Sequence, residues 1–167
     1  IPASMKSKVT LIQNGKQGKD LIFSGPLTSP KFSSDGKMLT INYLTDTHDF
    51  WLGATEIITY DLQTKSIKHL HSTQKDTIRK VYGLHNNIIY YLHENGVSYQ
   101  LKALDIRTEK SRALTPYGSI WENFSFSSDF SELAALHESA GTPSEIHQSP
   151  RQAIQANPIT HLNAYLK

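Results

Sequence analysis

The sequence predicts an all-β fold made of repeated four-stranded units, and three observations support this prediction. Short β-prone runs bounded by Gly, Pro, Asn and Asp follow one another along the chain, without a helical period of apolar residues. The tetrapeptide Phe-Ser-Ser-Asp occurs at residues 32–35 and again 94 residues later (126 minus 32). Between the copies, Asp61 and Asp105 stand in similar turns 44 residues apart (105 minus 61). Four short strands every 44 to 48 residues are typical of β-propeller blades.

We therefore predict a partial β-propeller that forms a single segment over residues 1–167. Residues 1–25 are expected to be a hairpin of a preceding blade, because Asn14, Gly15 and Gly18 supply turn residues between two short β-prone runs. Three further stretches are each expected to form one four-stranded blade: residues 29–71, 78–116 and 120–164. An immunoglobulin-like sandwich or a barrel also contains short strands, but it has no reason to repeat internal motifs at this period.

The strands expected within the blades are rich in β-branched and aromatic residues and are separated by turn residues. In chain order they cover residues 31–33, 38–44, 56–61 and 66–70 of the first blade, 78–84, 88–93, 99–105 and 110–114 of the second, and 121–127, 132–138, 144–148 and 159–162 of the third. Leu70, Leu114 and Leu162 end the last strand of each blade. The aromatic side chains of Trp51, Tyr90, Trp121 and Phe126 are expected to pack between blades.

The composition is that of a globular chain and excludes several functional classes. Of the 167 residues, 38% are hydrophobic and 19% charged, and the mean hydropathy is −0.42. No apolar run approaches the ~18 residues that a membrane span needs. The net charge is only +2 and the basic residues are scattered, so we expect no nucleic-acid partner. The chain has no Cys, which excludes disulfides and thiolate metal sites and leaves the compartment open between cytoplasm and periplasm.

The repeated unit resembles a known propeller family. Ser-Ser-Asp-Gly at residues 33–36, followed by a strand, a loop, a strand ending in Asp-Leu, a turn and a strand ending in Leu, is similar to the TolB-like, or WD40-like, repeat. That family usually has Ser-Pro-Asp-Gly, so Ser34 replaces Pro here and Phe130 replaces Gly in the third blade. Residues 126–129, 133–136, 138–139 and 142–146 also look like the last propeller blade of the prolyl oligopeptidase family of serine peptidases.

The resemblance implies a parent enzyme of dipeptidyl, acylaminoacyl or prolyl oligopeptidase type, with an α/β-hydrolase domain after Lys167 that carries the catalytic triad. This chain would then be a non-catalytic segment that gates or orients peptide substrates, and the hydrolase domain and the peptide would be its partners. The alternative is a TolB-like protein-binding propeller without enzymatic activity. We predict no catalytic residue, cofactor or metal ligand within the chain itself, so whether it belongs to an enzyme stays open at this point.

The loop at residues 45–54 is the best candidate for contact with a substrate or with another domain. It is the longest loop on the predicted hydrolase-facing side and carries Asp46, His48, Asp49 and Trp51. The loops at residues 94–98 and 139–143 are expected on the same side. The turns at residues 35–36, 64–65 and 108–109 are expected on the opposite side.

Other residues of catalytic type are better explained as structural. Ser98 and Ser139 each lack one glycine of the Gly-x-Ser-x-Gly nucleophile motif, and both stand between β-prone runs. His69 and His71 have metal-capable spacing, but no third ligand is evident in the sequence nearby. Finally, fewer than four blades leave open flanks, so we expect two copies to associate as a homo-oligomer.

Overall fold

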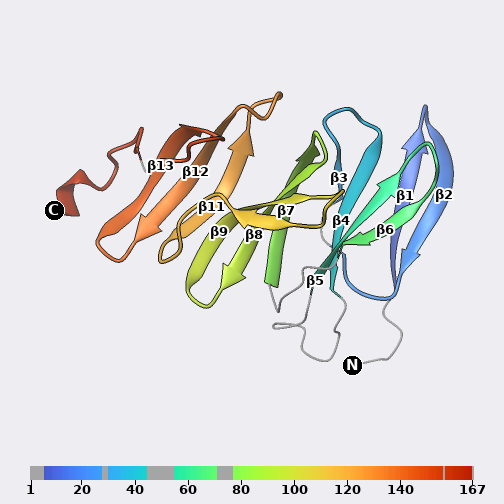
Figure 1. Ribbon diagram of the computed structural model, residues 1–167, viewed down its shortest axis with the longest axis horizontal. Coiled ribbons are helices and arrows are strands. Elements are labelled where there is room, and N and C mark those ends of the chain that lie inside the picture. Colours follow the sequence, from blue (N-terminus) through green and yellow to red (C-terminus); the bar gives the residue numbers. More distant parts are fainter. Residues whose placement is uncertain (1–5, 28–29, 45–54, 71–76, 156, 167) are drawn as a thin grey trace.

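A computed structural model describes residues 6–27, 30–44, 55–70, 77–155 and 157–166 of the chain. It confirms the all-β fold and shows a row of sheets that does not close on itself (Figure 1). The strands are β1 (Ser7–Gln13), β2 (Lys16–Phe23), β3 (Lys31–Phe32), β4 (Met38–Leu44), β5 (Thr55–Asp61), β6 (Ile67–Leu70), β7 (Thr77–His85), β8 (Ile88–Asn95), β9 (Ser98–Asp105), β10 (Ser111–Ala113), β11 (Ile120–Phe126), β12 (Glu132–Ser139) and β13 (Thr142–Pro150). A 3₁₀ turn, η1 (Ala164–Leu166), follows. No helix in the described part of the chain has the length and apolarity to cross a membrane.

The strands fall into four antiparallel groups in chain order. We call β3–β6 blade 1, β7–β10 blade 2 and β11–β13 blade 3; β1 and β2 form a separate hairpin. A single parallel pair, Tyr99 with Ile120, joins the edge of blade 2 to blade 3, so that these two blades count as one sheet. Blade 1 meets blade 2 through a parallel bridge between Ser33 and Leu84. The Ser34 N–H donates to the Leu84 carbonyl at 2.9 Å beside that bridge.

The repeated sequence motifs produce repeated turns. The Asp61 Oδ1 atom accepts the N–H groups of Gln63 and Thr64, both at 2.8 Å. The Asp105 Oδ1 atom accepts the N–H groups of residues 107 and 108 at 2.8 and 3.3 Å. The pKa of each carboxyl is lowered, chiefly by these backbone hydrogen bonds. The 44-residue spacing of Asp61 and Asp105 therefore arises because both blades use the same aspartate-capped turn.

The two Phe-Ser-Ser-Asp copies also form the same local structure. In the first copy the Ser33 hydroxyl donates to Asp35 Oδ1 at 2.6 Å, and the residue after the aspartate, Gly36, has a φ of +70°. In the second copy Ser127 donates to Asp129 Oδ1 at 2.7 Å, and Phe130 has a φ of +57°. Three hydrogen bonds from Ser127 and Ser131 lower the pKa of Asp129 to about 2.

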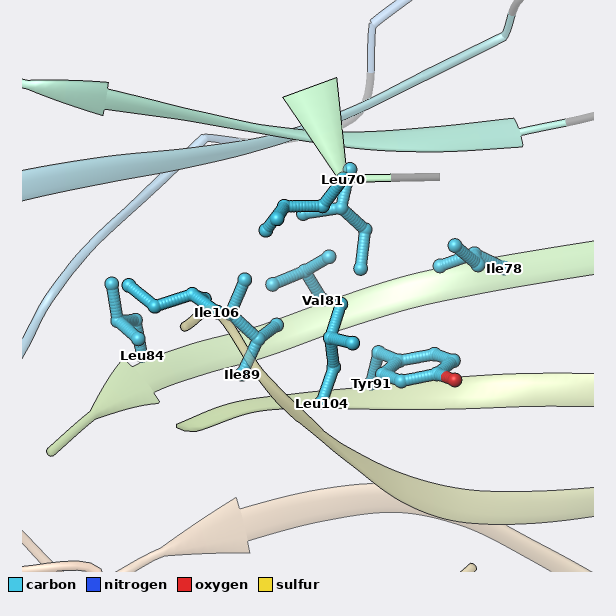
Figure 2. Close-up of a cluster of buried hydrophobic side chains, with 9 residues drawn as sticks. Leu70, Ile78, Val81, Leu84, Ile89, Tyr91, Leu104 and Ile106 are labelled. Atoms are coloured by element: carbon cyan, nitrogen blue, oxygen red, sulfur yellow. The ribbon is translucent and has the colours of Figure 1, made fainter. Parts of the chain in front are cut away.

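The core lies between the sheets, in three layers of apolar side chains. Successive residues of a strand point to opposite faces, so Ile57 of β5 packs toward blade 2 and Ile58 packs toward the β1–β2 hairpin. In β8, Tyr91 likewise packs toward blade 1 and Tyr90 toward blade 3. The layer between blades 1 and 2 contains Leu70, Ile78, Val81, Leu84, Ile89, Tyr91, Leu104 and Ile106 (Figure 2). Burial on both faces explains the nearly continuous apolar runs of these strands.

The expected packing of aromatic residues between blades is confirmed for Trp121 and Tyr90, which are both buried, and Phe126 packs against the same layer. The fourth strand expected at residues 159–162 is wrong. Only an isolated bridge between His147 and Pro158 continues the sheet there. Pro158 has no N–H to donate, and Leu162, aligned with Leu114 by the repeat, is 71% exposed.

The segment after Pro158 makes one backbone bond to β13, from the Ile159 N–H to the Ile146 carbonyl at 2.8 Å, and is otherwise held by side chains, above all by the Glu145 carboxylate. Glu145 accepts hydrogen bonds from the Thr160 hydroxyl and from the N–H groups of Leu162 and Asn163, the latter two at 3.2 and 2.9 Å. Asn163 Nδ2 donates to the Ser144 carbonyl at 2.9 Å. These bonds, the Thr160 hydroxyl foremost, lower the pKa of Glu145. They turn the chain away from β13 into η1.

Candidate functional site

The predicted contact residues Asp46, His48, Asp49 and Trp51 lie outside the described residues. The strands on either side of their loop are described, and Leu44 pairs with Thr55 there. At the other end of the same strands, Met38 pairs with Asp61. The flanks of the loop therefore lie at the end of blade 1 opposite to the turn that contains Lys65.

The same two ends can be followed through blade 2. The Ile78 N–H donates to Thr55 Oγ1 at 2.7 Å, which places the start of β7 beside the start of β5. The turn between β8 and β9, at Gly96, is at this end, because Thr77 at the start of β7 pairs with Glu94, just before the turn. The Ile106 N–H donates to the Asn87 carbonyl at 2.9 Å, so the other two turns of blade 2 share the opposite end.

Neither Ser98 nor Ser139, the two serines with a partial Gly-x-Ser-x-Gly motif, forms the strand-to-helix turn of a catalytic nucleophile, the nucleophile elbow. Ser98 is buried at the start of β9, where its hydroxyl accepts the Gly118 N–H at 3.0 Å. Ser139 is the last residue of β12 and is followed by a tight turn into β13. No helix follows either serine in the described part of the chain, as the strand-to-helix motif requires.

The histidine spacing does not form a metal site in the described residues either. His71 lies outside them, and His69 Nδ1 lies 3.2 Å from the Glu56 carboxylate. Among the described residues no group of three His, Cys, Asp or Glu side chains is placed to hold a metal ion.

A cavity lined by charged side chains lies between blades 2 and 3. Its volume is about 430 Å³. We call it the inter-blade groove; it is lined by Asn86, Ile88, Tyr90, Ala103, Asp105, Thr108, Lys110, Ser111, Arg112, Leu114, Arg151 and Gln152. Cross-strand pairing explains the composition of the floor, because Tyr90 pairs with Ala103 and Ala103 pairs with Arg112. These three side chains therefore share the face of blade 2 that looks toward blade 3.

The charges in the inter-blade groove are predominantly positive. Arg151 of blade 3 donates to the Tyr90 hydroxyl, and its guanidinium carbon lies 5.6 Å from the centre of the Tyr90 ring. Lys110 and Arg112 come from the turn and edge strand of blade 2. The one carboxylate, Asp105, already accepts two backbone N–H groups and lies 3.4 Å from the Arg107 guanidinium. Three aliphatic side chains, Ile88, Ala103 and Leu114, thus share the groove with three cations.

Sequence reasoning missed the inter-blade groove. The alternation of Lys110, Arg112 and Leu114 indicates that the three side chains share one face of a strand. Arg151, however, stands in the connection after β13, and nothing in the sequence connects it with Tyr90, 61 residues away.

A second polar cluster lies within blade 3, where His147 is buried and His137 is partly buried. The rings of His137 and His147 lie 4.9 Å apart at an interplanar angle of 80°, and His137 lies 4.3 Å from Trp121. No hydrogen-bond partner within the described residues reaches His147 Nδ1, His147 Nε2 or His137 Nδ1. Burial lowers the pKa of both imidazoles. The pair is therefore kept neutral and acts as part of the packing.

Comparison with known proteins finds similarity in structure alone. No family model matches the chain, and no curated protein sequence matches it. TolB from Acinetobacter baumannii superimposes with a TM-score of 0.64 and 19% identity, over 92% of this chain and 40% of that one. An acylaminoacyl peptidase from Pyrococcus horikoshii gives a TM-score of 0.67 and 15% identity, over 95% of this chain and 23% of that one.

A third match is the β-propeller domain of the Trilobed protease from Pyrococcus furiosus, which has an open velcro topology. Its TM-score is 0.63 at 12% identity, over 90% of this chain and 46% of that one. The chain thus spans less than half the length of each of these three structures. The described strands, the layers between them and these similarities lead to one conclusion: the chain has the fold of part of a β-propeller, like those of TolB and of prolyl oligopeptidase-family peptidases.

Proposed function

We propose that the chain is the non-catalytic propeller segment of a serine peptidase of the prolyl oligopeptidase family. One observation carries the proposal: almost the whole chain superimposes on about a quarter of an acylaminoacyl peptidase. The lack of a nucleophile elbow in the described residues agrees with a supporting role. In this proposal the triad belongs to an α/β-hydrolase domain of the same polypeptide.

In this proposal, the segment selects which peptides reach the active site and takes no part in the chemical step. In this proposal, loops at one end of the propeller form a rim that a peptide contacts before it reaches the hydrolase domain. The flanks of the 45–54 loop, the Gly96 turn and the Gly141 turn each end a hairpin between the second and third strands of a blade. We propose that this end faces the hydrolase and that Asp46, His48, Asp49 and Trp51 contact peptide or hydrolase there.

Kinetics of the full-length protein test the proposal. Hydrolysis of peptide anilides should be abolished by a serine-directed phosphonate. The double change Asp46→Ala with Asp49→Ala should raise KM by about threefold or more and leave kcat close to wild type, because uniform binding is lost and the triad is intact. A matched control is Lys16→Ala with Lys19→Ala on the first hairpin. A full-length protein that neither hydrolyses peptides nor reacts with the phosphonate would contradict the proposal.

A protein-binding propeller without activity is the second candidate. The superposition on TolB favours it, at a TM-score of 0.64 over 92% of the chain. Labelling by a fluorophosphonate distinguishes the candidates, because only a serine hydrolase with an activated nucleophile reacts. Covalent labelling of the full-length protein supports the peptidase. Its absence, together with a stable complex with a partner protein, supports the binding module.

A further inference from the structure

The edge of blade 2 beside the inter-blade groove has free backbone groups. β10 pairs with β9 and, within the described residues, has no neighbour on its other side. Two backbone hydrogen bonds flank the pairing of β10 with β9. The Asp105 N–H donates to the Lys110 carbonyl at 3.1 Å, and the Leu114 N–H donates to the Leu101 carbonyl at 2.8 Å. They place the backbone groups of residues 110, 112 and 114 toward β9. The N–H and carbonyl groups of Ser111 and Ala113 therefore point outward, and both residues are exposed.

The side chains along this edge carry unpaired positive charge. Among the described residues, no carboxylate lies within ion-pair distance of Lys110, Arg112 or Arg151, and the side chains of Lys110 and Arg112 make no hydrogen bond. Arg112 points from β10 over the groove, and Arg151 faces it from blade 3. The groove that they share is also lined by three apolar side chains, Ala103, Ile88 and Leu114.

We propose that an extended acidic segment of a partner protein adds as a strand to the free edge of β10. An added strand lies about 4.8 Å from its neighbour and sends alternate side chains to the same face. Those on the face of Arg112 enter the inter-blade groove. Carboxylates there meet Arg112, Lys110 and Arg151, while a small apolar side chain covers the floor. The backbone of the segment bonds to Ser111 and Ala113.

The geometry favours a peptide over a nucleic acid. Three cations in a groove between two blades match two or three carboxylates. A phosphate backbone instead needs an extended basic surface, and the whole chain carries a net charge of only +2. An inorganic anion would use the cations but would leave the unpaired edge of β10 without a partner.

This site is independent of the proposed peptidase role. The inter-blade groove contains Asn86 and Thr108, so it opens beside the turns at the end opposite to Gly96. The substrate-facing rim proposed above is at the Gly96 end. Loss of partner binding and loss of peptide selection can therefore be measured separately.

Fluorescence anisotropy of the full chain with a short fluorescent peptide of alternating Glu and Val tests the proposal. Arg112→Gln together with Lys110→Gln should weaken binding about tenfold, the equivalent of two lost charge-assisted contacts at a partly desolvated site. Lys16→Gln with Lys19→Gln is the control for net charge and should leave binding unchanged. Ala113→Pro should also weaken binding by about tenfold, because it removes an outward N–H and leaves the ladder to β9 intact.

Other outcomes would overturn the proposal. A peptide of alternating Lys and Val, or a single-stranded oligonucleotide, that binds as tightly as the Glu peptide would exclude recognition of an acidic segment. Full binding by the Ala113→Pro variant would exclude strand addition at β10. If the control variant with Lys16→Gln and Lys19→Gln loses the same affinity for the peptide, the weaker binding reflects net charge and not the proposed site. Circular dichroism of each variant checks that the blades remain folded.

Discussion

Phe130 occupies a backbone position that favours glycine, and its ring compensates for this. Its φ is +57°, where the equivalent residue of the first unit is Gly36. Such a conformation costs roughly 1 to 2 kcal/mol for a residue with a Cβ atom. The ring stacks on His85 and Phe126, with centroid distances of 5.1 and 5.0 Å. It also lies directly over Gly83, where a Cβ atom would be only 2.8 Å from it.

The stability of Phe130 variants should therefore follow an unusual order. Phe130→Ala should destabilise the chain by about 2 kcal/mol through lost burial. Phe130→Gly should be more stable than Phe130→Ala by about 1 kcal/mol, because glycine relieves the backbone strain. Urea unfolding measures both. At Phe126, which has no positive φ, the Gly variant should instead be the less stable of the two. An Ala variant more stable than the Gly variant at position 130 would contradict this explanation.

The histidine pair of blade 3 should make stability decrease as the pH falls below about 6.5. Burial lowers the folded-state pKa of His137 and His147 below 6.5, so the unfolded chain binds more protons as pH falls through that value. Stability is then complete above pH 6.5 and decreases below it. Urea midpoints at pH 7.5 and 5.5 should differ for wild type and differ less for His147→Phe. The carboxyls with lowered pKa, such as Glu145, act only below about pH 4.5 and do not interfere.

Among the elements, the last segment of blade 3 has its largest set of hydrogen bonds on one side chain, Glu145. Because Glu145 accepts three hydrogen bonds from residues 160–163, Glu145→Ala should release this segment while β12 and β13 stay paired. Amide hydrogen exchange at Leu162 and Asn163 should rise roughly tenfold or more, the equivalent of at least about 1.4 kcal/mol. Glu138→Ala, on the exposed side of β12, should leave these amides unchanged. Unchanged exchange in Glu145→Ala would show that packing, not the carboxylate, holds the segment.

The sequence predicted most of the elements because their causes are local. Alternating apolar residues and turn residues such as Asn14-Gly15 and Asp35-Gly36 determine strands and turns over a few residues. The prediction of a fourth strand in blade 3 was wrong. Pro158 interrupts the ladder of backbone hydrogen bonds, and Glu145 replaces it with side-chain bonds. The pattern of apolar residues along the sequence does not reveal such a replacement. The inter-blade groove could not be predicted for a different reason, because it depends on which faces of strands distant in the sequence meet. The predicted contact loop at residues 45–54 stays a prediction.

For the whole molecule, the open row of sheets predicts self-association of the isolated chain. Ile22 on the hairpin at one flank is 67% exposed, and its neighbours Leu21 and Phe23 face the core. An exposed apolar flank beside a free strand edge favours pairing with another copy. Light scattering should show a mass that rises with concentration above that of the 18.8 kDa chain. Ile22→Lys with Ile12→Lys should reduce the rise.

The control for this prediction is Val97→Lys, which changes an even more exposed apolar side chain at the tip of the β8–β9 turn. It should leave association unchanged, because the turn tip is not part of either flank. A monodisperse monomer at millimolar concentration would contradict association through the flanks.

The row of sheets also determines how the chain carries mechanical load. β1 and β13 lie at opposite ends of the row (Figure 1). Tension applied between them passes through every layer in series, so the row opens at whichever layer yields first. Between blades 2 and 3 the backbone connection is one parallel pair, Tyr99 with Ile120, and the apolar layer there is interrupted by the inter-blade groove. A closed ring divides the same tension between two arcs, so each layer between blades carries less of the load in a ring than in a row.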